Sequence, residues 1–213
     1  MKILFFGDSI TDCGRTESID PVNNLGEGFV LKIKERFDKT CPDKHEIINR
    51  GISGNRIVDL LARYKRDCVN YKPDLISILI GVNDVWHFKY TNGVRLELFA
   101  QLYRVMLNEI KRELPSAKLI LCEPFVLKGT ATENNEEFPN QYELFKTVYD
   151  YAKEVEKIAR EFDIPLVYLQ EEVSKKAKEK GNAVILGDGV HPVEEGKQIL
   201  CDEWLKVFNK YYN

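Results

Sequence analysis

The fold of this chain is decided near its start, by the stretch Ile3-Leu4-Phe5-Phe6-Gly7-Asp8-Ser9-Ile10-Thr11-Asp12. Its first four residues form a short apolar run that ends at a glycine, a pattern typical of a central strand in a parallel sheet. Such a strand brings Ser9 to the carboxyl edge of the sheet, where ligands bind in open α/β folds. Glycine, aspartate and serine are also ordinary turn residues, so this tripeptide alone does not distinguish a functional serine from a simple turn.

Four further apolar runs alternate with segments whose apolar residues recur at helical spacing. The runs cover residues 45–49, 75–80, 118–122 and 166–169; the expected helices cover residues 27–37, 94–114, 141–162 and 171–180, with two more after Asn55 and after His191. This alternation predicts parallel βαβ units in a three-layer α/β/α sandwich, with a five-stranded parallel sheet in the flavodoxin-like order 2-1-3-4-5. Because neither repeats nor linkers interrupt the pattern, we expect a single domain over residues 1–213.

Composition narrows the classes of partner. The 213 residues are 44% hydrophobic and 31% charged, with a net charge of -3 from 31 Lys and Arg against 34 Asp and Glu. There is no basic excess to neutralise phosphates, so nucleic acid is not an expected partner. No apolar stretch is long enough to cross a bilayer and no long apolar leader is present, so we expect no membrane partner and a cytoplasmic protein.

The five cysteines argue against a disulfide framework and against a zinc site, because they are odd in number, widely spaced and contain no C-x-x-C. We expect neither a metal nor a cofactor. Cys13 is close enough to Ser9 to line the same cleft and is an alternative nucleophile, but no histidine near it in the sequence supports a thiolate.

The predicted strand order places strand 1 between strands 2 and 3, so that the turns bearing Gly54 and Asn83 flank the turn bearing Ser9. A serine nucleophile needs a base and a group that orients this base. The segment Asp188-Gly189-Val190-His191-Pro192 offers both, with His191 as the base and Asp188 as its partner across a tight turn. The alternative is that His191 only caps the last helix.

Three neutral donors are candidates for stabilising the developing oxyanion: the backbone amides of Ser9 and Gly54 and the side-chain amide of Asn83. Gly54 could instead belong to a helix-entry turn, in which Asn55 is the expected N-cap, and Asn83 could be bonded to its own turn. The candidate substrate-binding residues are Asp8, Trp86, His87 and Tyr90. Trp86 suits stacking on a sugar or closing an acyl pocket, with a core aromatic as the alternative.

These motifs resemble the ordered blocks of the GDSL/SGNH hydrolase superfamily: Gly7-Asp8-Ser9, Gly54, Asn83 and Asp188-x-x-His191. The longer strings GDSITDCGR, NRGISGN, SILIGVNDVW and GVHP resemble its intracellular acetyl xylan esterase branch. The resemblance implies serine-dependent removal of acetyl groups from small carbohydrates without a metal, the same catalytic and oxyanion residues, and a homo-oligomer. Ile10 replaces the leucine that gives GDSL its name, a change expected to alter packing rather than chemistry. The α/β-hydrolase nucleophile motif G-x-S-x-G is absent.

Two other functions stay open at this point. A lysophospholipase or thioesterase would use the same triad on a longer acyl chain, and a catalytically silent sugar-binding protein would keep only the fold. Residues 124–140 form a long polar segment that suits either a lid or an arm contacting another subunit. The sequence fixes neither the acetylated sugar nor the preferred acyl chain.

Overall fold

The computed structural model describes residues 1–16 and 24–212. Its centre is a parallel sheet of five strands in the order β2-β1-β3-β4-β5. The strands are β1 (Lys2–Gly7), β2 (Glu46–Gly51), β3 (Leu75–Leu79), β4 (Lys118–Cys122) and β5 (Leu166–Val167). The predicted α/β class and the flavodoxin-like strand order are therefore confirmed.

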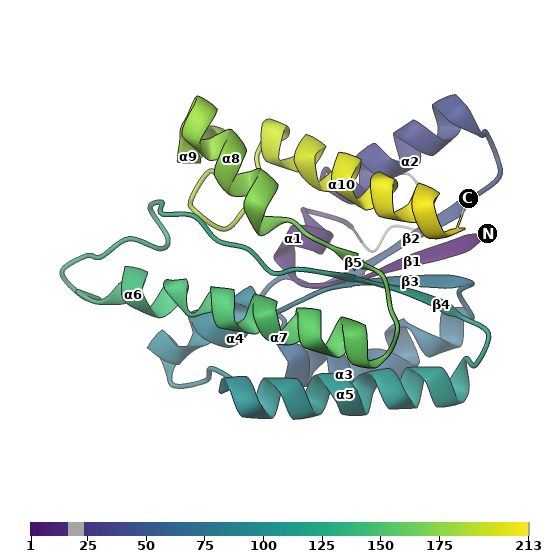
Figure 1. Ribbon diagram of the computed structural model, residues 1–213, viewed down its shortest axis with the longest axis horizontal. Helices are drawn as coiled ribbons and strands as arrows, with labels where there is room; N and C mark the ends of the chain where they lie inside the picture. The colour runs from purple at the N-terminus through teal and green to yellow at the C-terminus, as the bar shows by residue number, and fades with distance from the viewer. Residues whose placement is uncertain (17–23, 213) are drawn as a thin grey trace.

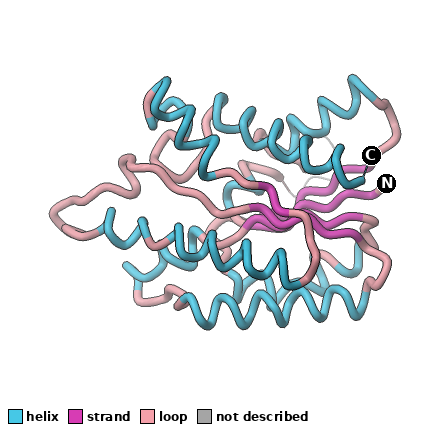
Figure 2. Tube along the Cα trace, viewed as in Figure 1, coloured by secondary structure: helices cyan, strands magenta, loops and turns pink. Residues whose placement is uncertain are grey.

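Helices cover both faces of the sheet (Figures 1 and 2). One layer holds α2 (Phe29–Thr40), α8 (Gln170–Lys180) and α10 (Glu194–Tyr212); the other holds α3 (Ile57–Asp67), α5 (Leu96–Glu113) and α7 (Val148–Glu161). The shorter elements are α1 (Ser9–Asp12), α4 (Val82–Trp86), α6 (Gln141–Lys146), α9 (Asn182–Ile185) and the 3₁₀ turns η1 (Val69–Tyr71) and η2 (His87–Tyr90). Among the helices that the structure describes, none is long and apolar enough to cross a membrane.

The two central strands are buried on both faces, as expected for a parallel sheet between helix layers. In β1, the four residues from Ile3 to Phe6 are at most 1% exposed. The one polar residue of β3, Ser77, is also buried, and its hydroxyl accepts a hydrogen bond of 2.9 Å from the indole Nε1 of Trp204. This bond satisfies two buried polar groups at once and ties α10 to the middle of the sheet.

Two expected helices differ in detail. In the helix expected over residues 94–114, apolar residues recur at steps of four from Leu98, which predicts that Leu98 faces the sheet; it is 41% exposed in α5, where Phe99 and Tyr103 face the core instead. A row of residues taken at steps of four turns about 40° per step around a helix of 3.6 residues per turn, so its far end leaves the buried face. The helix expected over residues 141–162 is divided into α6 and α7 at Thr147, whose hydroxyl donates to the Leu144 carbonyl at 2.7 Å.

The end of β1 is shaped by close contacts around Gly7. A Cβ atom at Gly7 would lie 2.5 Å from the Leu79 carbonyl oxygen of β3 and 2.4 Å from the Thr11 hydroxyl, so no larger residue fits without displacing either element. Directly after it, the buried Asp8 caps α1 by accepting a hydrogen bond from the Ile10 amide at 3.0 Å. Ser9 is therefore the first residue of a short helix that starts at the carboxyl edge of the sheet.

Candidate active site

Ser9 and His191 lie in hydrogen-bond contact although 182 positions separate them in the sequence. The Ser9 Oγ is 2.9 Å from the His191 Nε2. Both residues border a cavity of about 320 Å³ whose remaining lining residues are Ser53, Gly54, Asn83, Trp86, His87 and Tyr90. The structure thus brings together most of the residues that the sequence analysis selected.

Asp188 holds the other side of the His191 ring. Its Oδ2 is 2.7 Å from the His191 Nδ1, and its Oδ1 accepts the backbone amides of Val190 at 2.9 Å and His191 at 2.8 Å. With a carboxylate opposite Nδ1, the proton of a neutral imidazole resides on Nδ1, so Nε2 carries the lone pair that can accept the Ser9 hydroxyl proton. The arrangement is suited to activating a serine nucleophile.

The pKa values of this pair support the same roles. Burial by itself raises the pKa of the Asp188 carboxyl, but the hydrogen bonds from the His191 ring and from the two backbone amides outweigh it and lower that pKa to about 2. The hydrogen bond to Asp188 raises the pKa of His191 above 6.5, against the opposing effect of burial.

The raised pKa of His191 predicts that kcat/KM decreases at acidic pH. Protonated His191 cannot accept a proton from Ser9, so kcat/KM should fall as the pH decreases through the raised pKa of His191, with an apparent midpoint above 6.5. The measurement is the pH dependence of kcat/KM for a neutral ester, in buffers of matched ionic strength. Undiminished turnover at pH values well below ~5 would remove His191 from the role of base.

The turn of Asp188 rests on the first half of the segment expected to be a lid or a contact arm. The Leu127 amide donates to the Gly189 carbonyl and the Ala131 amide donates to the Asp188 carbonyl, each at 2.9 Å. Thr132, which is fully buried, donates its hydroxyl proton to the Leu127 carbonyl at 2.7 Å and so closes the loop on itself. Residues 126–132 therefore act as a support for the Asp188–His191 turn.

The three residues expected to supply oxyanion donors, Ser9, Gly54 and Asn83, line the same cavity. The Asn83 Nδ2 donates one hydrogen bond to the Asn55 carbonyl at 3.1 Å, which leaves its second N–H available. Gly54 has φ +80°, a conformation that side chains with a Cβ rarely adopt, and a Cβ there would meet nothing within 4 Å. Within residues 1–16 and 24–212, we find no hydrogen-bond partner for the backbone amides of Ser9 and Gly54.

The prediction that Asp8 contacts substrate is corrected by the structure. Asp8 is 1% exposed, lies beneath Ser9 and is not among the residues lining the cavity. Burial raises the pKa of its carboxyl to about 7. Asp84, next to Asn83, is equally buried; its carboxylate accepts the Ile57 amide at 3.0 Å and so fixes the start of α3 against α4. Both carboxyls therefore shape the backbone of the site.

The aromatic candidates lie as expected at the cavity. Trp86 is half-buried: its ring packs edge-on against Phe145 at 5.4 Å and tilted against His191 at 5.9 Å, so it belongs to the core and to the cavity wall at once. Tyr90 is 61% exposed at the rim. Burial lowers the pKa of His87, and the nearby Arg56 adds to the effect, so His87 is a neutral wall residue near pH 7.

The alternative nucleophile Cys13 is disfavoured. It borders a much smaller cavity of about 30 Å³ that also touches Ser9 and His191. Burial raises the pKa of its thiol, which opposes thiolate formation, and the His191 Nε2 is bonded to Ser9. In the part of the chain that is described, no group of three or more His, Cys, Asp or Glu side chains is placed to hold a metal ion.

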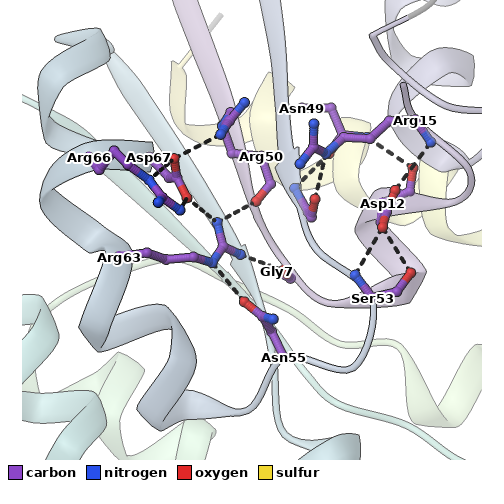
Figure 3. A network of polar contacts seen from close by, with 11 residues as sticks. Gly7, Asp12, Arg15, Asn49, Arg50, Ser53, Asn55, Arg63, Arg66 and Asp67 are labelled. Atoms are coloured by element: carbon purple, nitrogen blue, oxygen red, sulfur yellow. Dashed lines mark hydrogen bonds and ion pairs between the residues drawn. The ribbon is translucent and has the colours of Figure 1, made fainter. Parts of the chain in front are cut away.

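Two side chains that the sequence analysis did not select hold the loop that carries Gly54 (Figure 3). Asp12 Oδ2 accepts the backbone amide of Ser53 at 2.9 Å and its hydroxyl at 2.8 Å. Arg63 Nε donates to the Asn55 Oδ1 at 2.7 Å. The sequence shows Arg63 and Asp67 at helical spacing, but no local signal reveals that Arg63 reaches a loop preceding its own helix.

Comparison with known proteins agrees with this geometry. The model of the GDSL-like Lipase/Acylhydrolase family matches residues 5–199. An acetylxylan esterase from Geobacillus stearothermophilus is 35% identical over 214 residues, covering 96% of this chain and 92% of that protein. Its crystal structure superposes with a TM-score of 0.83 at 33% identity, over 96% of this chain and 92% of that chain.

Other solved structures extend the comparison. A candidate GDSL-like lipase from Parabacteroides merdae superposes with a TM-score of 0.85 at 32% identity, covering 98% of this chain and 95% of that one. The solved variants of the Geobacillus enzyme include catalytic mutants in which a serine, an aspartate or a histidine is replaced by alanine. The family match covers most of the chain and includes the strand, the serine turn and the histidine turn described above. This chain belongs to the GDSL-like lipase/acylhydrolase family and is a carboxylic ester hydrolase.

Proposed function

We propose that this enzyme removes O-acetyl groups from carbohydrates, with acetylated xylo-oligosaccharides as the substrate class, through an acetyl-enzyme intermediate on Ser9. The observation that carries the proposal is the hydrogen-bonded series Ser9–His191–Asp188, which opens into a cavity lined by polar and aromatic groups. Trp86 and Tyr90 offer aromatic surfaces of the kind that contact sugar rings. The catalytic serine, aspartate and histidine mutants of the Geobacillus esterase support the same three roles here.

The first half of the proposed reaction forms the acetyl-enzyme. His191 Nε2 takes the Ser9 hydroxyl proton as Oγ attacks the acetyl carbonyl carbon, and the carbonyl oxygen becomes an oxyanion. The amides of Ser9 and Gly54 and the free N–H of Asn83 donate to this oxygen. When the intermediate collapses, the C–O bond to the sugar breaks and His191 gives its proton to the departing sugar hydroxyl.

The second half releases acetate. A water molecule gives a proton to His191 while its oxygen attacks the acetyl-Ser9 carbonyl, and the same three donors hold the second oxyanion. Collapse breaks the bond to Ser9 Oγ, which recovers its proton from His191. Asp188 keeps its charge throughout and stabilises the imidazolium that forms in each half.

One observation favours the alternative of a longer acyl chain. A second cavity, of about 260 Å³, is lined by Phe88, Phe138, Pro139 and Leu144 together with more polar neighbours. Lys89 lines this second cavity, and its Nζ is 5.4 Å from the centroid of the Phe138 ring and 5.2 Å from that of Trp86, which lines the cavity at Ser9. The segment over residues 124–140 thus contributes apolar surface that its polar composition did not indicate.

A panel of esters separates the two proposals. We expect kcat/KM to be highest for acetyl esters and to fall for butanoyl, octanoyl and dodecanoyl esters of the same alcohol, because the cavity at Ser9 is lined mainly by residues with polar side chains and offers little apolar surface to a long chain. Acetylated xylo-oligosaccharides, other acetylated sugars and lysophospholipids are then compared under the same conditions. A steady rise of kcat/KM with acyl length would contradict the acetylesterase proposal and favour a lysophospholipase or thioesterase.

A further inference from the structure

The loop between β2 and α3 carries the Gly54 donor, yet it is a polar turn with little packing of its own. Ser53 is exposed and Gly54 is half-buried, and the turn is closed by a weak bond from the Asn55 amide to the Ile52 carbonyl at 3.2 Å. Donors stabilise an oxyanion only when they are held in place before the charge develops. Contacts from outside the loop must therefore supply its rigidity.

Asp12 holds one side of this loop through Ser53, and Arg63 holds the other. The Arg63 guanidinium donates through Nε to the Asn55 Oδ1 at 2.7 Å, through Nη2 to the Gly7 carbonyl at 3.0 Å and through Nη1 to the Arg50 carbonyl at 2.9 Å. Figure 3 shows these three bonds running from the Arg63 side chain to two backbone carbonyls and to the Asn55 side chain. Arg63 is 8% exposed and its guanidinium carbon lies 4.4 Å from the centroid of the Phe6 ring.

Two of these acceptors, Gly7 and Asn55, lie close in the sequence to groups of the reaction. Gly7 precedes Asp8 and the nucleophile, so its carbonyl fixes the end of β1 from which Ser9 projects. Asn55 follows Gly54, and its own carbonyl accepts the side-chain amide of Asn83 at 3.1 Å. Arg63 therefore bonds the backbone that precedes the Ser9 turn and the side chain of the residue after Gly54, and Asn55 in turn bonds Asn83.

The charge of this buried arginine is compensated away from the active site. Arg63 Nη1 is 3.3 Å from the Asp67 Oδ2, and Asp67, 1% exposed, also accepts hydrogen bonds from Arg50 at 2.8 Å and from Arg66. The planar guanidinium of an arginine can donate hydrogen bonds in several directions while it keeps this ion pair, whereas the compact ammonium of a lysine cannot. The residue type is thus matched to its four acceptors.

We propose that Arg63 is a positioning residue for ester hydrolysis, which aligns the Ser9 turn and the Gly54 loop into one oxyanion site. The proposal rests on the acyl-transfer mechanism given above and adds to it a side chain that never touches the substrate. A role limited to anchoring α3 would affect the free energy of unfolding alone. A positioning role lowers kcat with little change in KM, because the donors act on the transition state.

The test compares Arg63→Met with Arg50→Met, using p-nitrophenyl acetate. Both changes remove an arginine that bonds Asp67, but the Arg50 side chain is only partly buried, bonds Asp67 at 2.8 Å and lies over the Tyr71 ring, away from the Gly54 loop. We expect Arg63→Met to lower kcat about 10²-fold with KM nearly unchanged, the scale at which misplacing catalytic groups by an ångström acts. Arg50→Met should keep kcat within about threefold, since surface-directed changes leave the reacting groups in place.

Asn55→Ala gives an independent route, because it removes the contact of Arg63 with the loop while the arginine stays in place. We expect kcat of Asn55→Ala to fall about tenfold. In the double variant with Arg63→Met, the increase in activation free energy should be smaller than the sum of the two single increases, because the two side chains are in contact. Should Arg63→Met fail to fold, a folded Asn55→Ala with unchanged kcat overturns the proposal. Equal kcat values for Arg63→Met and Arg50→Met, or a loss confined to KM, overturn it as well.

The sugar-free substrate keeps this test separate from the proposed function. If the unmodified enzyme hydrolyses p-nitrophenyl acetate but none of the acetylated sugars, the carbohydrate proposal fails while the comparison of Arg63 with Arg50 remains decisive. If the sugars are deacetylated and Arg63→Met behaves like Arg50→Met, the carbohydrate proposal stands and the positioning role of Arg63 is overturned.

Discussion

Ser9→Ala is expected to lower kcat for acetyl ester hydrolysis by about 10⁴- to 10⁶-fold, the range found when a triad member is deleted. The loss follows from the geometry: the only group bonded to His191 Nε2 among the described residues is the Ser9 hydroxyl, at 2.9 Å. The measurement is steady-state turnover of p-nitrophenyl acetate, with circular dichroism to establish that the variant is folded.

Cys13→Ser provides the matched control for this change. Cys13 borders the small cavity on the other side of Ser9, and burial raises the pKa of its thiol. We expect the variant to keep its turnover within a few-fold. Retained turnover in Ser9→Ala together with its loss in Cys13→Ser would reassign the nucleophile to the thiol. Mass spectrometry of the quenched reaction should show an acetyl group on the peptide containing Ser9.

Asp188→Asn is expected to lower kcat by about 10⁴-fold, as the equivalent change does in other triads. The reason lies in the two carboxylate oxygens. Oδ1 accepts the backbone amides of Val190 and His191, so in the variant the amide oxygen keeps this place and the NH₂ group faces the His191 Nδ1. Nδ1 must then act as the acceptor, which moves the ring proton to Nε2 and leaves no lone pair for Ser9.

Glu194→Gln is the control for this second prediction, because it neutralises a carboxylate three positions beyond His191 in the exposed first turn of α10. Its partner is the Lys32 ammonium, and we expect turnover to be unchanged. The two variants are compared in kcat and in the pH dependence of kcat/KM. Similar kcat values for Asp188→Asn and the unmodified enzyme would exclude Asp188 as the partner of the base.

The strands and their order could be predicted from the sequence because they follow from the hydrophobic pattern of short segments. The buried runs of β1 and β3 are continuous and apolar, so their strands and the strand order follow from hydrophobic pattern and from the rules for parallel sheets. Once the order is known, turns at the carboxyl ends of neighbouring strands must meet. This is why Ser9, Gly54 and Asn83 could be grouped although no local signal links them.

Two errors arise from specific side-chain bonds, one to a distant residue and one within a turn. Asn55 was expected to cap α3, but Arg56 is the N-cap and its backbone amide is bonded by Asp59, while the Asn55 side chain turns to Arg63. Asp8 was expected to reach the substrate, but its capping bond to Ile10 draws it under the helix. Neither bond can be read from periodicity, because periodicity records only which face of an element is buried.

The contact of Ser9 with His191 spans 182 positions, and the turn of His191 is docked on residues 126–132 from the middle of the chain. Closing so large a loop is entropically costly and depends on the sheet being in place beforehand. Hydrolytic activity therefore requires the complete fold. During refolding from denaturant, activity should return no earlier than the helical circular dichroism signal. A nascent chain would likewise be inactive until the segment that carries Asp188 and His191 has been synthesised and has joined the first strand.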